Sequence, residues 1–200
     1  MLKVAVLVSG SGSTLQSILD YRQAYFKVEM VIGSKEGIYA LERAKNKNIP
    51  TYVVSKEEYG SEISNKILEL TKNRVDLIVL AGYLKIITPK FVDEFRNKII
   101  NIHPSLIPSF CGKGYYGEKV HQGVIDYGAK VTGATVHFVD EGADTGAIIM
   151  QETVNVEQDD DAKSLAKRVL EVEHRILKES IRLFCENKLS IQGRRVFINE

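Results

Sequence analysis

The sequence predicts an α/β protein built on a single doubly wound, mostly parallel sheet of the Rossmann-like kind, with helices on both faces. Short runs rich in Val and Ile alternate with longer amphipathic stretches, which is the pattern of strand–helix–strand units. A turn rich in glycine and serine follows the first run, at a place where sheets of this class hold ligands. The 44% hydrophobic and 26% charged fractions are those of a folded globular protein.

Strands and helices alternate regularly in the first half of the chain. The short apolar runs predict four strands, over residues 3–8, 27–32, 51–54 and 75–80. The amphipathic stretches between them predict helices over residues 14–25, 38–47 and 58–73. Strands joined through helices pair in parallel with right-handed crossovers, so this half is expected to supply the parallel part of the sheet.

The second half is less regular. Pro89 is expected at the first turn of a short helix, where its missing N–H costs nothing. A strand over 98–103 ends at Pro104 and leads into a long glycine-bearing loop over 105–117, which is typical of a lid or a binding loop. The remaining elements are a helix over 118–127, strands over 133–139 and 147–156, and a helix over 159–187 with Asp159, Asp160 and Asp161 in its first turn. We expect residues 1–200 to form one domain.

Charge and composition exclude several classes of partner. The 27 basic and 26 acidic residues leave a formal charge of +1, so neither nucleic acid nor an anionic membrane is an expected partner. The apolar run over 4–8 is too short for a membrane span or a secretory signal. Cys111 and Cys185 lack motif spacing and are expected as free thiols, which favours the cytoplasm. The four histidines show no metal-ligand spacing, so we expect no metal and a small-molecule substrate.

The turn over residues 9–14 has the composition of an anion site. Glycines allow the backbone to approach a ligand closely, and the hydroxyl groups of Ser13 and Thr14 add donors. The dinucleotide fingerprint is incomplete because Leu15 stands at its third glycine position, and no acid follows the second strand. A single phosphate is therefore favoured over a nicotinamide or ATP. The alternative is a tight turn whose hydroxyls cap a helix.

Asn101 and His103 carry the residue types that acyl transfer needs. Side chains alternate along a strand, so these two project to the same side at its carboxyl end. An amide donor beside an imidazole suits the stabilisation of an oxyanion and the transfer of a proton. A carboxylate of the acidic loop 140–146 is expected to orient His103 and raise its pKa. The alternative is a buried histidine bonded to a carbonyl, with the asparagine capping a turn.

Glu173 lies near the middle of the apolar stripe of the last predicted helix. A carboxylate on such a stripe needs a partner, because burying it alone costs several kcal/mol. The residues alone leave two partners open, a basic side chain of the protein or a cationic or hydroxylated ligand group. Of the other histidines, His121 is expected to cap a helix, His137 to be interior with a backbone partner, and His174 to be structural.

Taken together, these motifs resemble the phosphoribosylglycinamide formyltransferases, the folate-dependent glycinamide ribonucleotide transformylases of purine synthesis. The resemblance covers nearly the whole chain. It is carried by residues 8–16, 80–87, 101–108 and 133–139, by Asp144, and by Glu173 with His174.

The resemblance implies transfer of the formyl group of 10-formyltetrahydrofolate to the primary amine of glycinamide ribonucleotide. It implies that His103 donates a proton to the tetrahedral intermediate, that Asn101 holds its oxyanion, and that Asp144 keeps His103 charged and oriented. The ribonucleotide would contact Gly12, Ser13, Thr14 and Glu173. The folate would contact Leu84, Lys85, Ile86, Ile87, Asn101 and Asp140. The phosphate-binding half would be about 1–100, and the folate and catalytic half about 101–200.

The chain departs from the family pattern at a few positions. Ser11 and Thr14 stand where asparagine is usual, Lys56 stands where arginine is common, and the loop 109–117 lacks the commoner proline-and-histidine sequence. The alternatives are a 10-formyltetrahydrofolate hydrolase, a methionyl-tRNA formyltransferase, and a phosphometabolite-binding module without catalysis. The first two are disfavoured because the chain shows neither a regulatory domain before its first strand nor a tRNA-binding extension. A monomer or homodimer is expected.

Overall fold

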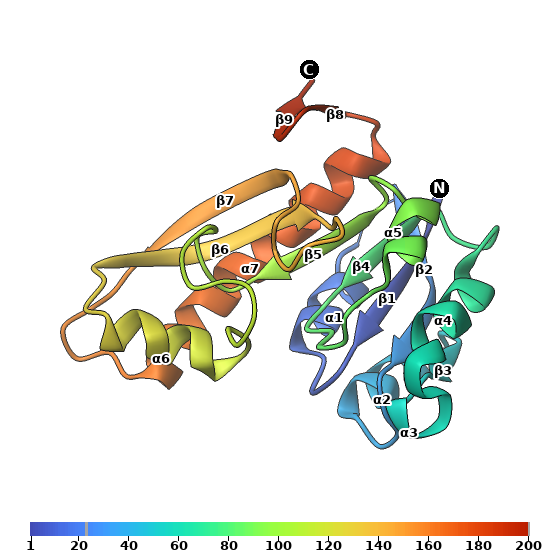
Figure 1. Cartoon of the computed structure of the whole chain (residues 1–200), viewed down its shortest axis with the longest axis horizontal. Coiled ribbons are helices and arrows are strands. Elements are labelled where there is room, and N and C mark those ends of the chain that lie inside the picture. The colour runs from blue at the N-terminus through green and yellow to red at the C-terminus, as the bar shows by residue number, and fades with distance from the viewer. Residues whose placement is uncertain (23, 200) are drawn as a thin grey trace. The chain divides into compact units, whose positions relative to one another are not determined.

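The computed structural model describes residues 1–22 and 24–199 and divides into two compact units, Met1–Ile100 and Asn101–Glu200. Figure 1 shows both units as mixtures of strands and helices. Each unit is described by itself. The α/β fold class is confirmed, and the strand pairings are mostly parallel. The expectation of one domain with two functional halves stays a prediction.

The first unit is a parallel sheet in the order β3-β2-β1-β4. Its strands are β1 (Leu2–Val8), β2 (Phe26–Gly33), β3 (Thr51–Val53) and β4 (Leu77–Leu80). Its helices are α1 (Ser13–Leu19), α2 (Tyr39–Lys45), α3 (Lys56–Tyr59), the 3-10 turn η1 (Gly60–Glu62), α4 (Ile63–Thr71) and α5 (Pro89–Glu94). Residues 4–8 of β1 are fully buried, as expected for a central strand covered on both faces.

The second unit begins within β5 (Ile99–His103) and has the strand order β5-β6-β7-β9-β8. Its other strands are β6 (Val131–Phe138), β7 (Ile148–Asn155), β8 (Leu189–Gln192) and β9 (Arg195–Ile198). β6 and β7 pair antiparallel, and burial alternates along β7, so one face of β7 is open to solvent. The helices α6 (Glu118–Asp126) and α7 (Ala162–Cys185) belong to this unit, and α7 packs against β6, β7 and α6.

Two helices of the first unit differ from those predicted. The helix predicted over 14–25 ends at Leu19, because the chain turns to bring the Tyr25 carbonyl to the Leu2 N–H (3.0 Å) and start β2. Residue 23 of that prediction lies outside the described residues. The helix predicted over 58–73 is broken at Gly60, whose φ of 53° and ψ of −118° are not helical. Pro89 does begin α5, as predicted.

The acidic start of α7 also differs from the prediction. The three aspartates do not lie in the first turn of the helix, because Asp161 is its N-cap. The Asp161 carboxylate accepts from the N–H groups of Lys163 and Ser164, at 3.0 and 2.7 Å, and so completes a capping box. Asp160 pairs with Arg168 instead. The hairpin of β8 and β9 was not predicted, although the alternating apolar residues around Gly193 (φ 61°) are its signal.

Candidate functional site

The glycine turn after β1 has the conformation that its sequence requires. Gly12 is the N-cap of α1 with φ 75° and ψ 30°, a left-handed conformation that glycine adopts at little cost. A Cβ atom at Gly12 would lie 2.6 Å from the Cβ of Ala40 in α2, so the position also has no room for a side chain. The Gln16 N–H donates to the Gly12 carbonyl at 2.8 Å and starts α1. Ser13 and Thr14 follow directly in the first turn of α1.

Ser9 connects this turn to the segment that the family resemblance assigns to folate. Its hydroxyl oxygen accepts from the Leu84 N–H at 3.0 Å and from the Ser34 hydroxyl at 2.9 Å. Leu84 is 58% exposed and Ile86 is 93% exposed, which is unusual for side chains of this size. The segment 84–87 therefore presents exposed apolar side chains close to the turn.

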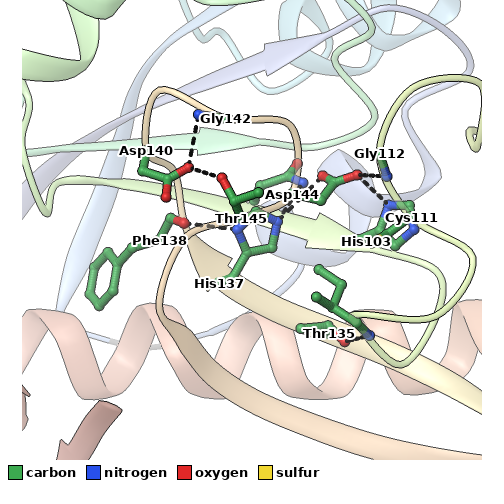
Figure 2. A network of polar contacts seen from close by, with 12 residues as sticks. His103, Cys111, Gly112, Thr135, His137, Phe138, Asp140, Gly142, Asp144 and Thr145 are labelled. Carbon is green, nitrogen blue, oxygen red and sulfur yellow. Dashed lines mark hydrogen bonds and ion pairs between the residues drawn. The ribbon is translucent and has the colours of Figure 1, made fainter. Parts of the chain in front are cut away.

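In the second unit, two strands and one loop bring four polar side chains together, and Figure 2 shows His103, His137 and Asp144 among them. Asn101 and His103 come from β5, His137 comes from β6, and Asp144 comes from the loop before β7. Asp144 lies between the two imidazoles: its carboxylate oxygens are 3.6 Å from His103 Nδ1 and 3.6 Å from His137 Nε2. The alternation predicted for Asn101 and His103 thus holds, and the acidic loop does supply the carboxylate.

His103 is buried and has an acceptor on each side of its ring. Its Nε2 lies 2.9 Å from the Phe110 carbonyl oxygen, and its Nδ1 faces Asp144. A carbonyl can only accept, so Nε2 carries a proton and donates it. Burial lowers the pKa of His103 below its usual value, although the Phe110 carbonyl and Asp144 both act to raise it. Asp144 of the acidic loop thus acts on the pKa of His103 in the expected direction, but desolvation outweighs the carboxylate and the net shift is downward.

His137 fixes the orientation of the Asn101 amide. The Phe138 carbonyl oxygen lies 2.8 Å from His137 Nδ1, so this nitrogen carries a proton and donates it. His137 Nε2 lies 3.1 Å from the Nδ2 of Asn101 and 3.6 Å from the Asp144 carboxylate. This contact holds the side-chain amide of Asn101 beside His137. The backbone partner predicted for His137 is confirmed, but its bond to Asn101 was not foreseen.

Asp144 is held by its loop as well as by the two histidines. Its φ is 57°, and its carboxylate accepts from the Gly112 N–H at 2.8 Å. Burial acts to raise the pKa of Asp144, but His137, the Gly112 N–H and His103 outweigh it and lower the pKa. Asp140 closes the same loop, because its Oδ1 accepts from the Gly142 N–H at 3.1 Å and from the Thr145 hydroxyl at 2.5 Å (Figure 2). Asp144 is thus a carboxylate at neutral pH.

A buried polar cluster supports the loop that carries Phe110. Thr135 donates from its hydroxyl to the Ser105 carbonyl at 2.6 Å and accepts from the Ile107 N–H at 3.1 Å. Ser105 in turn donates to the Ser109 carbonyl at 2.6 Å. These bonds explain how a segment without helix or strand places the Phe110 carbonyl against His103. The sequence predicted the loop, but none of these hydrogen bonds follows from its composition.

Glu173 lies on α7, where the helix faces the interior. Burial raises the pKa of its carboxyl group to about 7. No basic side chain pairs with Glu173 within the part of the chain that the structure describes. Of the two partners left open by the sequence, the basic residue is therefore not found among the described residues.

His121 is not a helix cap, contrary to the prediction. It lies inside α6, is 4% exposed, and its Nδ1 has no hydrogen-bond partner among the described residues. Burial, reinforced by His103, lowers the pKa of His121 to about 4. His121 is thus neutral at physiological pH.

The low pKa of His121 predicts how the stability of the fold depends on pH. In the unfolded chain a histidine titrates near 6.5, whereas folded His121 titrates near 4. Between these values the unfolded state binds the proton more tightly, so the free energy of unfolding falls as the pH drops from 6.5 to 4. This residue contributes at most about 1.4 kcal/mol per pH unit. Urea unfolding at several pH values measures the slope. The variant His121→Phe should show a shallower slope, and an equal slope would contradict the prediction.

The described residues contain no group of three or more side chains placed to hold a metal ion. They also contain no helix long and apolar enough to cross a membrane. Neither Cys111 nor Cys185 forms a disulfide within the described part of the chain.

Comparison with known proteins gives consistent matches. A family model described as "Formyl transferase" matches residues 2–181. The chain is 41% identical to a chloroplastic phosphoribosylglycinamide formyltransferase of Vigna unguiculata, with 94% of this chain and 62% of that protein covered. It is 38% identical to the phosphoribosylglycinamide formyltransferase of Haemophilus influenzae, with 100% and 94% covered. The chain therefore spans less than two thirds of the Vigna protein.

Solved structures agree with these matches. Glycinamide ribonucleotide transformylase 1 from Symbiobacterium toebii is 39% identical with a TM-score of 0.93, over 100% of this chain and 95% of that chain. A formyltetrahydrofolate deformylase from Pseudomonas syringae is 25% identical with a TM-score of 0.88, over 100% of this chain and 66% of that chain.

Proposed function

The chain belongs to the formyl transferase family, and from that premise we propose that it transfers a formyl group to a ribonucleotide amine in purine biosynthesis. The donor is 10-formyltetrahydrofolate and the acceptor is the primary amine of N1-(5-phospho-D-ribosyl)glycinamide. The observation that carries the proposal is the cluster of Asn101, His103 and Asp144, which contains an amide donor, an imidazole and a carboxylate beside that imidazole, the groups that acyl transfer needs.

Each residue of the cluster has a part in the proposed reaction. Attack of the amine on the formyl carbon places negative charge on the formyl oxygen. The side-chain amide of Asn101 donates to that oxygen and stabilises its charge, and the contact with His137 keeps the amide in place. His103 donates a proton to the tetrahedral intermediate at the folate nitrogen N10, the bond between N10 and the formyl carbon breaks, and tetrahydrofolate leaves. The proton lost by the attacking amine restores the imidazole, whose Nδ1 is kept in place by Asp144. Asp144 stabilises the positive charge of His103 while the proton is held.

Substrate binding is assigned to the other predicted residues. Gly12, Ser13 and Thr14 bind the ribonucleotide phosphate, and Glu173 contacts the ribonucleotide with a carboxyl group that burial makes half protonated near pH 7. Leu84, Lys85, Ile86 and Ile87 bind the folate, with the exposed apolar side chains of the segment against its ring system. Asn101 and Asp140 complete the folate contacts. No metal takes part in the proposal, and the expected location is the cytoplasm.

The partners proposed for the chain are these two small molecules. The balanced charge of +1 favours neither nucleic acid nor a membrane surface. A monomer or a homodimer is expected.

The second candidate function is hydrolysis of the formyl group, since a formyltetrahydrofolate deformylase shares the fold. The purified chain is therefore mixed with 10-formyltetrahydrofolate, and release of tetrahydrofolate is followed with and without glycinamide ribonucleotide. We expect release that requires the ribonucleotide. Equal release without it would identify a hydrolase, and no release in either mixture would favour a binding module.

A further inference from the structure

We propose that Arg43 of α2 is a positioning residue for the phosphate site, acting through the backbone of the glycine turn. The inference rests on the proposed function, because it concerns the same phosphate. Sequence reasoning did not single out Arg43. The structure places it against the turn, with its Nε donating to the Ser11 carbonyl at 2.9 Å.

Two successive carbonyl groups of the turn are bound by α2. The Ala40 N–H donates to the Gly10 carbonyl at 3.3 Å, and Arg43 donates to the Ser11 carbonyl. In a trans peptide the carbonyl and the following N–H point in opposite directions. The N–H groups of Ser11 and Gly12 therefore both point away from α2. Successive N–H groups directed to one side form a concave site for an anion.

The guanidinium group of Arg43 is itself held in one orientation. Its Nη1 donates to the Gln16 side chain at 2.9 Å, and its central carbon lies 4.6 Å from the centre of the Tyr39 ring. A planar group with two donors fixed on different acceptors cannot be replaced by a lysine, which offers a single charged nitrogen. Arg43 thus acts by geometry as well as by charge.

The close approach of α2 to the turn depends on small residues. Gly12 has no Cβ, and the methyl group of Ala40 fills the space beside it. A Cβ at Gly12 would also lie 3.4 Å from the Cδ of Arg43, so the aliphatic part of the arginine side chain packs beside the turn at the same place. The turn is therefore shaped by packing from α2 in addition to its own glycine conformation.

The test measures phosphate binding directly, without turnover. Inorganic phosphate is titrated into ¹⁵N-labelled protein while the amide signals of Ser11 and Gly12 are followed by NMR. We expect saturable shifts of these signals in the wild type, and a Kd raised about tenfold in Arg43→Met. Arg43→Lys keeps the charge but lacks the planar group with two donors, and we expect it to bind phosphate nearly as weakly as Arg43→Met. With the ribonucleotide as substrate, KM should rise by a similar factor while kcat stays near the wild-type value.

Arg74 offers a matched control in the same unit. It also lies over a tyrosine ring, 5.8 Å from the centre of Tyr52, and donates to its hydroxyl at 3.3 Å, but it does not contact the turn. Arg74→Met should leave phosphate binding unchanged, and an equal loss there would overturn the inference. Wild-type phosphate affinity in a folded Arg43→Met protein would also overturn the inference. Wild-type phosphate affinity in Arg43→Lys would overturn it too, because only the charge of the side chain would then matter. Absence of shifts in the wild type would instead overturn the phosphate site of the proposed function.

Discussion

Replacing His103 by alanine is expected to lower kcat by roughly a hundred- to ten-thousand-fold, the range that a general acid contributes. The His103 imidazole can deliver a proton, and its Nδ1 lies 3.6 Å from the orienting carboxylate of Asp144. The measurement is steady-state release of tetrahydrofolate in the presence of the ribonucleotide. As a control for folding, His103→Ala should unfold in urea at a midpoint close to that of the wild type. Near-normal turnover by this variant would remove His103 from the mechanism.

The pH dependence of kcat/KM tests the same assignment from another side. A proton donor loses activity as the pH rises through its pKa, and burial places the pKa of His103 below its usual value of 6.5. Asp144 acts to raise that pKa, so Asp144→Asn should move the falling limb of the profile to lower pH. An unmoved limb would show that Asp144 does not act on His103.

The second large effect concerns the stability of the second unit. Gly146 is buried beside β6, and a methyl group there would overlap the Phe138 carbonyl oxygen. The same stretch of backbone is held by the Phe138 N–H, which donates to the Ala147 carbonyl at 2.9 Å. Because the clash is with backbone, no side-chain rotation relieves it. Gly146→Ala is expected to cost about 4 kcal/mol or more, above the 1–3 kcal/mol typical of overpacking.

Urea unfolding measures this cost, and Gly10→Ala is its control. A Cβ at Gly10 meets nothing within 4 Å, and the residue does not have a left-handed φ. The free energy of unfolding of Gly10→Ala should therefore lie within about 0.5 kcal/mol of the wild-type value. The packing argument would be contradicted if the free energy of unfolding of Gly146→Ala lay within about 1 kcal/mol of the wild-type value at an unchanged m-value.

Arg43 and His137 are the residues that sequence reasoning missed at the candidate site. Arg43 lies on a predicted helix and has an ordinary amphipathic setting, so nothing in its neighbours along the chain indicates a contact with Ser11. His137 was expected to bond to backbone, which it does, but its second nitrogen meets Asn101 from another strand. Both contacts join segments that are far apart in the chain, and a single sequence does not contain the pairing.

The sequence by itself determined the features that depend on near neighbours. Buried runs such as residues 4–8 become strands because every side chain is apolar, and Pro89 begins a helix because its own ring sets φ. The common direction of Asn101 and His103 follows from the two-residue repeat of a strand.

Only the tertiary structure decided the features that depend on contacts across the chain. Gly60 breaks a stretch that is amphipathic on both sides, and His121 is buried without a partner for Nδ1 among the described residues. The pKa of His103 is the clearest case, because Asp144 acts to raise it and burial lowers it by more. Desolvation is a property of everything packed around a group, and no local pattern of residues records it.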